Sequence, residues 1–159
     1  MAIALEKIGD TNTLATGYTH MASFESSDLS ASTGAQATDV TYGGSQLAGL
    51  IKGAAIVVEE LVSADVSTGS DVSDATIALG DNADPNGFVV EANCFTGDTN
   101  NLIFQNNGVL LDGQTSSEHI VTAVDVTSNG TGNGFGNATK GKFKIFLEYY
   151  PTAGEHYSG

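Results

Sequence analysis

The chain has 159 residues, of which 40% are apolar, and its 19 acidic residues, five lysines and no arginine give a net charge of −14 at pH 7. This length suffices for one domain that buries about 70% of its unfolded surface, and the apolar content excludes compositional disorder. A surface this negative, without arginine to clamp phosphates, excludes binding to nucleic acids and anionic membranes.

Cys94 is the only cysteine, so the chain cannot form an internal disulfide bond. The N-terminal sequence MAIALEKIGD lacks the basic region of a signal peptide. No apolar run approaches the roughly 18 residues that a membrane span needs. We therefore expect a soluble protein that is made in a cytoplasm and stays there unless a larger particle carries it out.

The first third of the chain differs in composition from the rest. Residues 1–48 are rich in Gly, Ser, Thr and Ala and contain few large apolar residues. Such a composition is typical of an extended arm or irregular lobe that lies on another surface. We therefore predict an N-terminal arm over residues 1–48 and a β-sandwich domain over residues 49–159.

Hydrophobic periodicity predicts strands in the second part. The β-branched run over residues 50–66 indicates a strand buried on both faces, although a helix is also compatible with it. Alternating patterns predict strands over 74–80, 118–127 and 140–151, and residues 101–111 form a hairpin around Asn107 and Gly108 in this interpretation. With no long amphipathic helix, this pattern predicts an all-β fold, an antiparallel sandwich or jelly-roll-like barrel.

The stretch from Gly80 to Cys94, GDNADPNGFVVEANC, begins like a calcium-binding loop. From Asn82, oxygen-bearing side chains occupy alternate positions and a glycine follows, as in the front half of such a loop. The twelfth position is Asn93 instead of the bidentate glutamate, and Pro85 interrupts the ligand pattern. We therefore predict no metal here.

A helix start explains the same stretch better than a metal site. Asp84 is a good N-cap and Pro85 suits the first helical position. Phe88, Ala92 and Phe95 then recur at helical spacing. The sequence therefore predicts a turn that enters one short helix crossing the sandwich.

The chain offers little for catalysis. By residue type, only Cys94, His119 and Asp125 could form a nucleophile, a base and an orienting group, and nothing in the sequence brings them together. His20 and His156 stand far apart, so the histidines lack the spacing of a zinc site. We predict a protein that is not an enzyme and has no cofactor and no metal.

Two features before the C-terminus indicate contacts with a partner. The glycine-rich segment 128–137 lacks the lysine of a phosphate-binding loop, and we interpret it as a surface loop that presents Phe135. Lys140, Lys142 and Lys144 lie on one face of the last strand. They either block edge-to-edge aggregation or dock an acidic partner or a second copy of the chain, and the two readings are compatible.

The stretches TIALGDNADPNGFVVEAN and GKFKIFLEYYP, together with the first third, resemble small virion proteins of tailed bacteriophages, over roughly residues 50–151. The resemblance implies a capsid decoration (cement) protein, a β-rich homo-oligomer with a trimer favoured. Such a protein binds the major capsid protein on the outer surface of the head and stabilises it. The motif residues carry over only as structural positions: Gly80, Asp81, Asp84, Pro85, Gly87 and Phe88.

We expect the arm and the two C-terminal features to bind the partner through Ile3, Leu5, Ile8, Tyr18, Phe24, Tyr42, Phe135, Lys140, Lys142 and Lys144. Deletion of residues 1–30 would then abolish attachment and leave the β-domain folded. One alternative is a tail, neck or head-fibre component. Another is a glycan-binding or receptor-binding sandwich that uses aromatic platforms, namely Phe135, Tyr149, Tyr150 and Tyr157.

Overall fold

A computed structural model describes residues 2–8, 18–30, 34–62, 74–81, 83–93, 102–105, 119–131 and 140–151. These residues form strands and one 3₁₀ turn, η1 (Ser26–Asp28). The strands are β1 (Ile3–Lys7), β2 (His20–Glu25), β3 (Gly34–Tyr42), β4 (Ser45–Gln46), β5 (Gly49–Val62), β6 (Asp74–Gly80), β7 (Val89–Asn93), β8 (Leu102–Gln105), β9 (His119–Val121), β10 (Val124–Thr131) and β11 (Lys140–Pro151). The predicted all-β class is confirmed.

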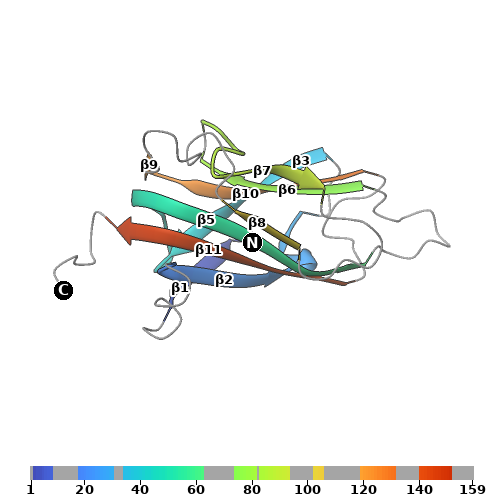
Figure 1. The fold of residues 1–159 in the computed structure, drawn as a ribbon, viewed down its shortest axis with the longest axis horizontal. Coiled ribbons are helices and arrows are strands. Elements are labelled where there is room, and N and C mark those ends of the chain that lie inside the picture. The colour runs from blue at the N-terminus through green and yellow to red at the C-terminus, as the bar shows by residue number, and fades with distance from the viewer. Residues whose placement is uncertain are drawn as a thin grey trace.

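The strands form two layers joined at one side by β1 (Figure 1). Strands β2, β11 and β5 lie side by side in one layer, and β3, β10, β6 and β7 lie in the other. Strand β1 pairs with β3 through residues 3–5 and with β2 through residues 6–7. The end strands β7 and β8 contact each other, so the sandwich is a nearly closed barrel. Because β1 runs parallel to β3, the sheet is mixed and not purely antiparallel as expected.

The core lies between the layers and depends most on β5 and β11. These strands pair in register from Lys140 opposite Val62 to Pro151 opposite Gly49, with two irregularities. The alternation predicted for residues 140–151 is confirmed, because Phe143, Ile145, Leu147 and Tyr149 are all buried. The strand predictions for 50–66 and 74–80 are confirmed over the described residues, with β5 described as far as residue 62.

The described residues of the first third are not an extended arm. They form β1, β2, β3 and β4, which pair with each other and with strands of the later part. The few large apolar residues of β1, β2 and β3 recur at alternate positions, so each of these three strands points an apolar side into the core. Composition predicted an arm because small and polar residues fill the outward positions of these strands.

The helix predicted after Asp84 is wrong. Asp84 accepts a hydrogen bond from the Gly87 N–H group at 3.0 Å, and Pro85 occupies the second position of this tight turn. An Asp-Pro-x-Gly sequence with this bond is typical of a type I turn. The chain then continues into β7, and both Phe88, just before the strand, and Val89, its first residue, are fully buried. The β-branched pair after the turn favours a strand against β6 over a helix.

The strand predicted over residues 118–127 is divided between the layers. Strand β9 pairs with β5, whereas β10 pairs with β3 and β6. The chain crosses from one layer to the other at residues 122–123. Strand β10 continues to Thr131, so the first residues of the predicted loop 128–137 belong to a strand. Residues 132–139, and the Asn107-Gly108 turn, lie outside the described residues.

Candidate functional site

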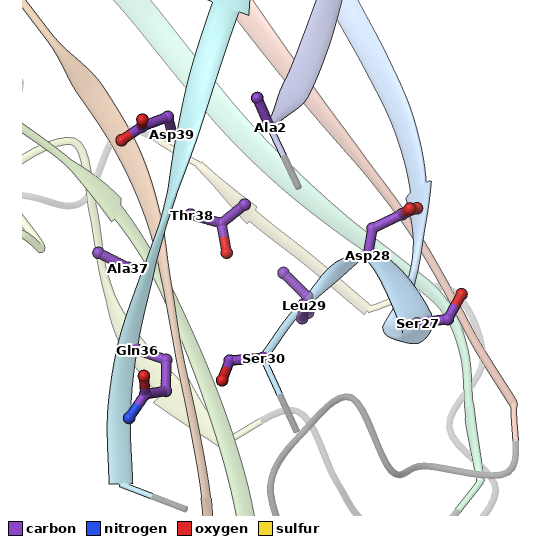
Figure 2. A pocket seen from close by; sticks show the side chains of 9 residues that line it. All are labelled: Ala2, Ser27, Asp28, Leu29, Ser30, Gln36, Ala37, Thr38 and Asp39. Atoms are coloured by element: carbon purple, nitrogen blue, oxygen red, sulfur yellow. The ribbon is translucent and has the colours of Figure 1, made fainter. Parts of the chain in front are cut away.

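A polar groove opens where the two layers separate next to the start of β1 (Figure 2). Strand β1 pairs with β3 only at residues 40–42, so over residues 34–39 β3 has β10 on one side and no described strand on the other. The groove has a volume of about 500 Å³. Its lining comes from β3, the end of β1 and the segment after β2: Ala2, Ser27, Asp28, Leu29, Ser30, Gln36, Ala37, Thr38 and Asp39.

The groove is suited to binding and not to proton transfer. Thr38 projects from β3 toward the segment that carries Leu29 and Ser30, whereas the carboxyl groups of Asp28 and Asp39 point away from the space between them (Figure 2). One carboxylate oxygen of Asp28 accepts the Glu25 N–H at 2.8 Å and caps η1. The side chains that face the groove are therefore aliphatic groups together with hydroxyl and amide groups, and the latter two kinds donate and accept hydrogen bonds.

A pair of carboxyl groups lies on the outer face of β3 and β10, beside this groove. Asp125 stands opposite Asp39 in the β3–β10 register and opposite Gly80 in the β6–β10 register. Although its strand neighbours Val124 and Val126 point into the core, Asp125 is only 8% exposed. Its Oδ1 atom is buried without a hydrogen-bond partner.

The surroundings of Asp125 favour its protonated form. Burial, a hydrogen bond with Asp39 and the negative charges of Asp39 and Asp81 together raise the pKa of Asp125 to about 6. A carboxyl group with this pKa exchanges a proton near pH 6, whereas an exposed aspartate is ionised there. The sequence suggested Asp125 only as an orienting group for Cys94 and His119 and did not connect it with Asp39, because the β3–β10 register that brings Asp39 beside it has no local signal.

The turn after β6 covers this face and is held by its own motif residues. The Asp81 Oδ1 atom accepts the N–H groups of Ala83 at 2.9 Å and of Asp84 at 2.7 Å. The Phe88 N–H donates to the Leu79 carbonyl at 2.9 Å. A Cβ atom at Gly80 would lie 2.1 Å from the Asp84 carbonyl oxygen, so the turn packs directly against the Gly80 backbone. The carboxylates of this motif thus build a turn, and in the described part of the chain no three acidic, histidine or cysteine side chains are placed to hold a metal ion.

The lysine strip of β11 is balanced by neighbouring acids. Lys142 is exposed and lies between Glu25 of β2 and Glu60 of β5 in the sheet register. The Lys144 Nζ atom lies 3.7 Å from a carboxylate oxygen of Glu59. Since β11 lies between β2 and β5, it is not an edge strand, and protection of a sheet edge does not explain its lysines. The structure describes only the backbone pairing of Lys140.

Aromatic side chains around His20 close one end of the core. The buried His20 ring contacts Tyr42 and Tyr149 edge-on, with ring centroids 4.7 and 5.2 Å apart. The Thr19 hydroxyl lies 2.7 Å from the His20 Nδ1 atom and accepts the Tyr149 N–H at 2.9 Å. The Tyr149 hydroxyl bonds with both the N–H and the carbonyl of Ala48. This cluster therefore has a structural role, because its hydrogen bonds connect β11 to the residue that precedes β5.

Several predicted contact residues are core residues. Ile3, Leu5, Ile8 and Phe24 are at most 7% exposed, so they do not face a partner in this fold. Phe24 stacks on Phe143 with ring centroids 5.3 Å apart. Two further residues of this group are half-buried, and both pack within the fold, Tyr18 on Phe146 and Tyr42 on His20.

Of the aromatic residues proposed to bind a glycan, two interact within the fold and two lie outside the described residues. Tyr149 is buried, as described above. The half-buried Tyr150 donates its hydroxyl to a Glu148 carboxylate oxygen at 2.5 Å, and this bond, together with burial and the negative charge of Glu148, raises the pKa of Tyr150 to about 12. The remaining predicted residues Phe135 and Tyr157, and also Cys94 and His156, lie outside the described residues. The His119 side chain is not described either, so of the three residues considered for catalysis the structure describes the side chain of Asp125 alone.

Comparison with known proteins gives no match to any family model, curated protein or solved structure. Among the described residues there is no helix with the length and hydrophobicity of a membrane span.

Proposed function

We propose that this chain is a non-enzymatic virion protein of a tailed bacteriophage, a decoration protein that binds the outer surface of the capsid lattice and stabilises the head. Its partner is the major capsid protein. The protein is made in the host cytoplasm and acts on the particle, as a homo-oligomer with a trimer favoured. Many copies of a modest interface, repeated by the symmetry of the lattice, would provide the stabilisation.

One observation carries this proposal. The motif that resembles phage virion proteins forms one compact turn after β6. Each motif residue named for this resemblance has a structural role in the turn or its packing. Asp81 caps the turn, Asp84 and Pro85 pack on Gly80, Gly87 closes the turn, and Phe88 fills the core. The residues on which the resemblance rests thus hold one another in place within a single turn.

Because the contact residues predicted in the first third are mostly buried in the core, we propose that the protein attaches to the capsid through the groove beside β3 instead. The groove is lined by polar and aliphatic side chains, among them the hydroxyl group of Thr38, and lies next to a stretch of β3 with no described strand on that side. An extended segment of a capsid subunit could add to this edge through main-chain hydrogen bonds, a recurring mode of peptide recognition.

Quantitative mass spectrometry of purified virions tests the proposal. The expected result is a copy number in a fixed, high ratio to the major capsid protein, and particles without the protein that lose their genome at a lower temperature. A low copy number, typical of a ring or fibre, would assign the chain to the tail, neck or head fibre. Absence of the chain from washed virions would overturn the proposal.

A variant with Ser30→Tyr tests the groove itself. The larger side chain would fill the space between the Leu29–Ser30 segment and β3, and we expect attachment to undecorated capsids to weaken at least tenfold. Ser45→Tyr is the matched control, because Ser45 is exposed on β4 away from the groove lining. Equal attachment of both variants would exclude the groove, whereas the copy number of the wild-type chain in virions would still test the proposed function.

A further inference from the structure

In the Asp39–Asp125 pair, a buried carboxyl group lies beside an exposed one of like charge. The two residues are direct neighbours across β3 and β10, and Asp125 is more than nine-tenths buried. Two ionised carboxylates in such contact repel each other, whereas one proton shared between them converts repulsion into a hydrogen bond. The Asp125 Oδ1 atom, which has no partner, gains nothing from the protein to offset ionisation.

The groups that face this pair are also acidic. Asp81, at the end of β6, contributes a further negative charge, and β3 contributes Asp39 itself. Strand β10 contains no titratable residue besides Asp125. The turn that Asp81 caps folds over Gly80, the residue in register with Asp125, so ionisation of the pair acts directly beneath the turn.

We propose that Asp39 and Asp125 hold one proton between them, and that this proton is a pH-dependent latch for the turn over residues 81–88. In acid the protonated pair holds β3, β10 and the turn together. As the pH rises through about 6, Asp125 ionises. The negative charges of Asp39, Asp81 and Asp125 then repel one another beneath the turn, and the turn loosens. This inference is independent of the partner that the protein binds.

Carboxyl ¹³C NMR titration of the wild-type chain measures the proton directly. The expected result is that Asp125 titrates near pH 6. The amides of Gly87 and Phe88, which are hydrogen-bonded in the turn, should exchange with solvent faster at pH 7.5 than the intrinsic effect of pH explains. Titration of Asp125 at an ordinary aspartate value would overturn the proposal.

Asp125→Asn tests the same step by equilibrium unfolding. An asparagine mimics the protonated carboxyl group, so the ratio of the wild-type unfolding constant to that of the variant should rise about tenfold between pH 5 and pH 7.5. Glu91→Gln is the matched control, since Glu91 is exposed on β7 and its change removes one charge from the same layer.

Three results would contradict the latch. Parallel pH profiles for the wild type and Asp125→Asn would exclude titration of the pair. If Glu91→Gln changed the pH dependence of the unfolding constant as much as Asp125→Asn does, the dependence would be due to net charge and not to the pair. Stabilisation of the wild type, but not of Asp125→Asn, by calcium chloride at pH 7.5 would show that a divalent cation occupies the pair instead of a proton. If Asp125→Asn does not fold, the NMR titration of the wild type decides alone.

Discussion

Replacing Gly80 by alanine tests how tightly the turn after β6 packs on the sheet. The new Cβ atom would lie 2.1 Å from the Asp84 carbonyl oxygen and 2.4 Å from the Pro85 carbonyl carbon, and both atoms belong to the backbone. An ordinary contact needs at least 3.4 Å, so the turn must retreat by more than 1 Å. The effect is purely steric, because only Gly34, Gly43 and Gly44 among the described glycines have positive φ angles.

The cost of this retreat follows from the bonds that it breaks. The bond from the Asp81 N–H to the Asp84 carbonyl and the two bonds of the Asp81 carboxylate all span the displaced segment. At about 1 kcal/mol each, their loss costs about 3 kcal/mol. The lower chain entropy of alanine in the unfolded state returns about 0.5–1 kcal/mol. We therefore expect Gly80→Ala to lower the free energy of unfolding by about 2 kcal/mol.

Urea unfolding followed by circular dichroism measures this change, with Gly44→Ala as the control. A Cβ atom at Gly44 meets no atom within 4 Å, so only its φ of +82° is unfavourable, which costs about 1 kcal/mol. Amide exchange at Gly87 should also lose protection in Gly80→Ala and keep it in Gly44→Ala. The reasoning is refuted if Gly80→Ala is as stable as the wild type, or if Gly87 keeps its protection.

Three further changes test the packing. Tyr149→Phe leaves both polar groups of Ala48 without the hydroxyl, and thermal unfolding should show a loss of about 1–2 kcal/mol; an unchanged Tm would contradict this. Deletion of residues 1–30 removes β1 and β2, and gel filtration and circular dichroism should show an unfolded chain, whereas a folded product would restore the arm hypothesis. Lys144→Gln breaks a half-exposed ion pair with Glu59, and its free energy of unfolding should change by less than about 1 kcal/mol; a larger loss would show that the pair is structural.

The sequence predicted those parts of the fold in which one strand contains its own signal. The alternation of residues 140–151 identifies β11 and its buried face, because every second side chain must enter the core. The same signal identifies β6, where Ile77 and Leu79 are buried. Such patterns are local, so they can be interpreted without knowing which strand lies alongside.

The strands of the first third were not predicted, because apolar content is a poor guide to burial in short strands. Two or three apolar residues at alternate positions suffice to seat a strand, as Ile3 and Leu5 do in β1. The DPNG sequence was also ambiguous. Aspartate before proline starts a helix as readily as a tight turn, and the β-branched residues after Phe88 decided between the two.

The candidate sites depended on pairing, which the sequence does not encode locally. Asp39 and Asp125 are 86 positions apart, and only the register of β3 with β10 makes them neighbours. The groove exists because β1 pairs with β3 for only three residues before the layers separate. The lysine strip was visible in the sequence, but the acids that balance it come from other strands, so its charge appeared unopposed.

A cryo-electron microscopy map of the virion that contains this protein tests the central claim most directly. We expect density for a two-layered β-sandwich at symmetry-related positions on the outer surface of the head, with the groove beside β3 facing a capsid subunit. Density for the chain only in the tail or neck, or a head surface without it, would contradict the account.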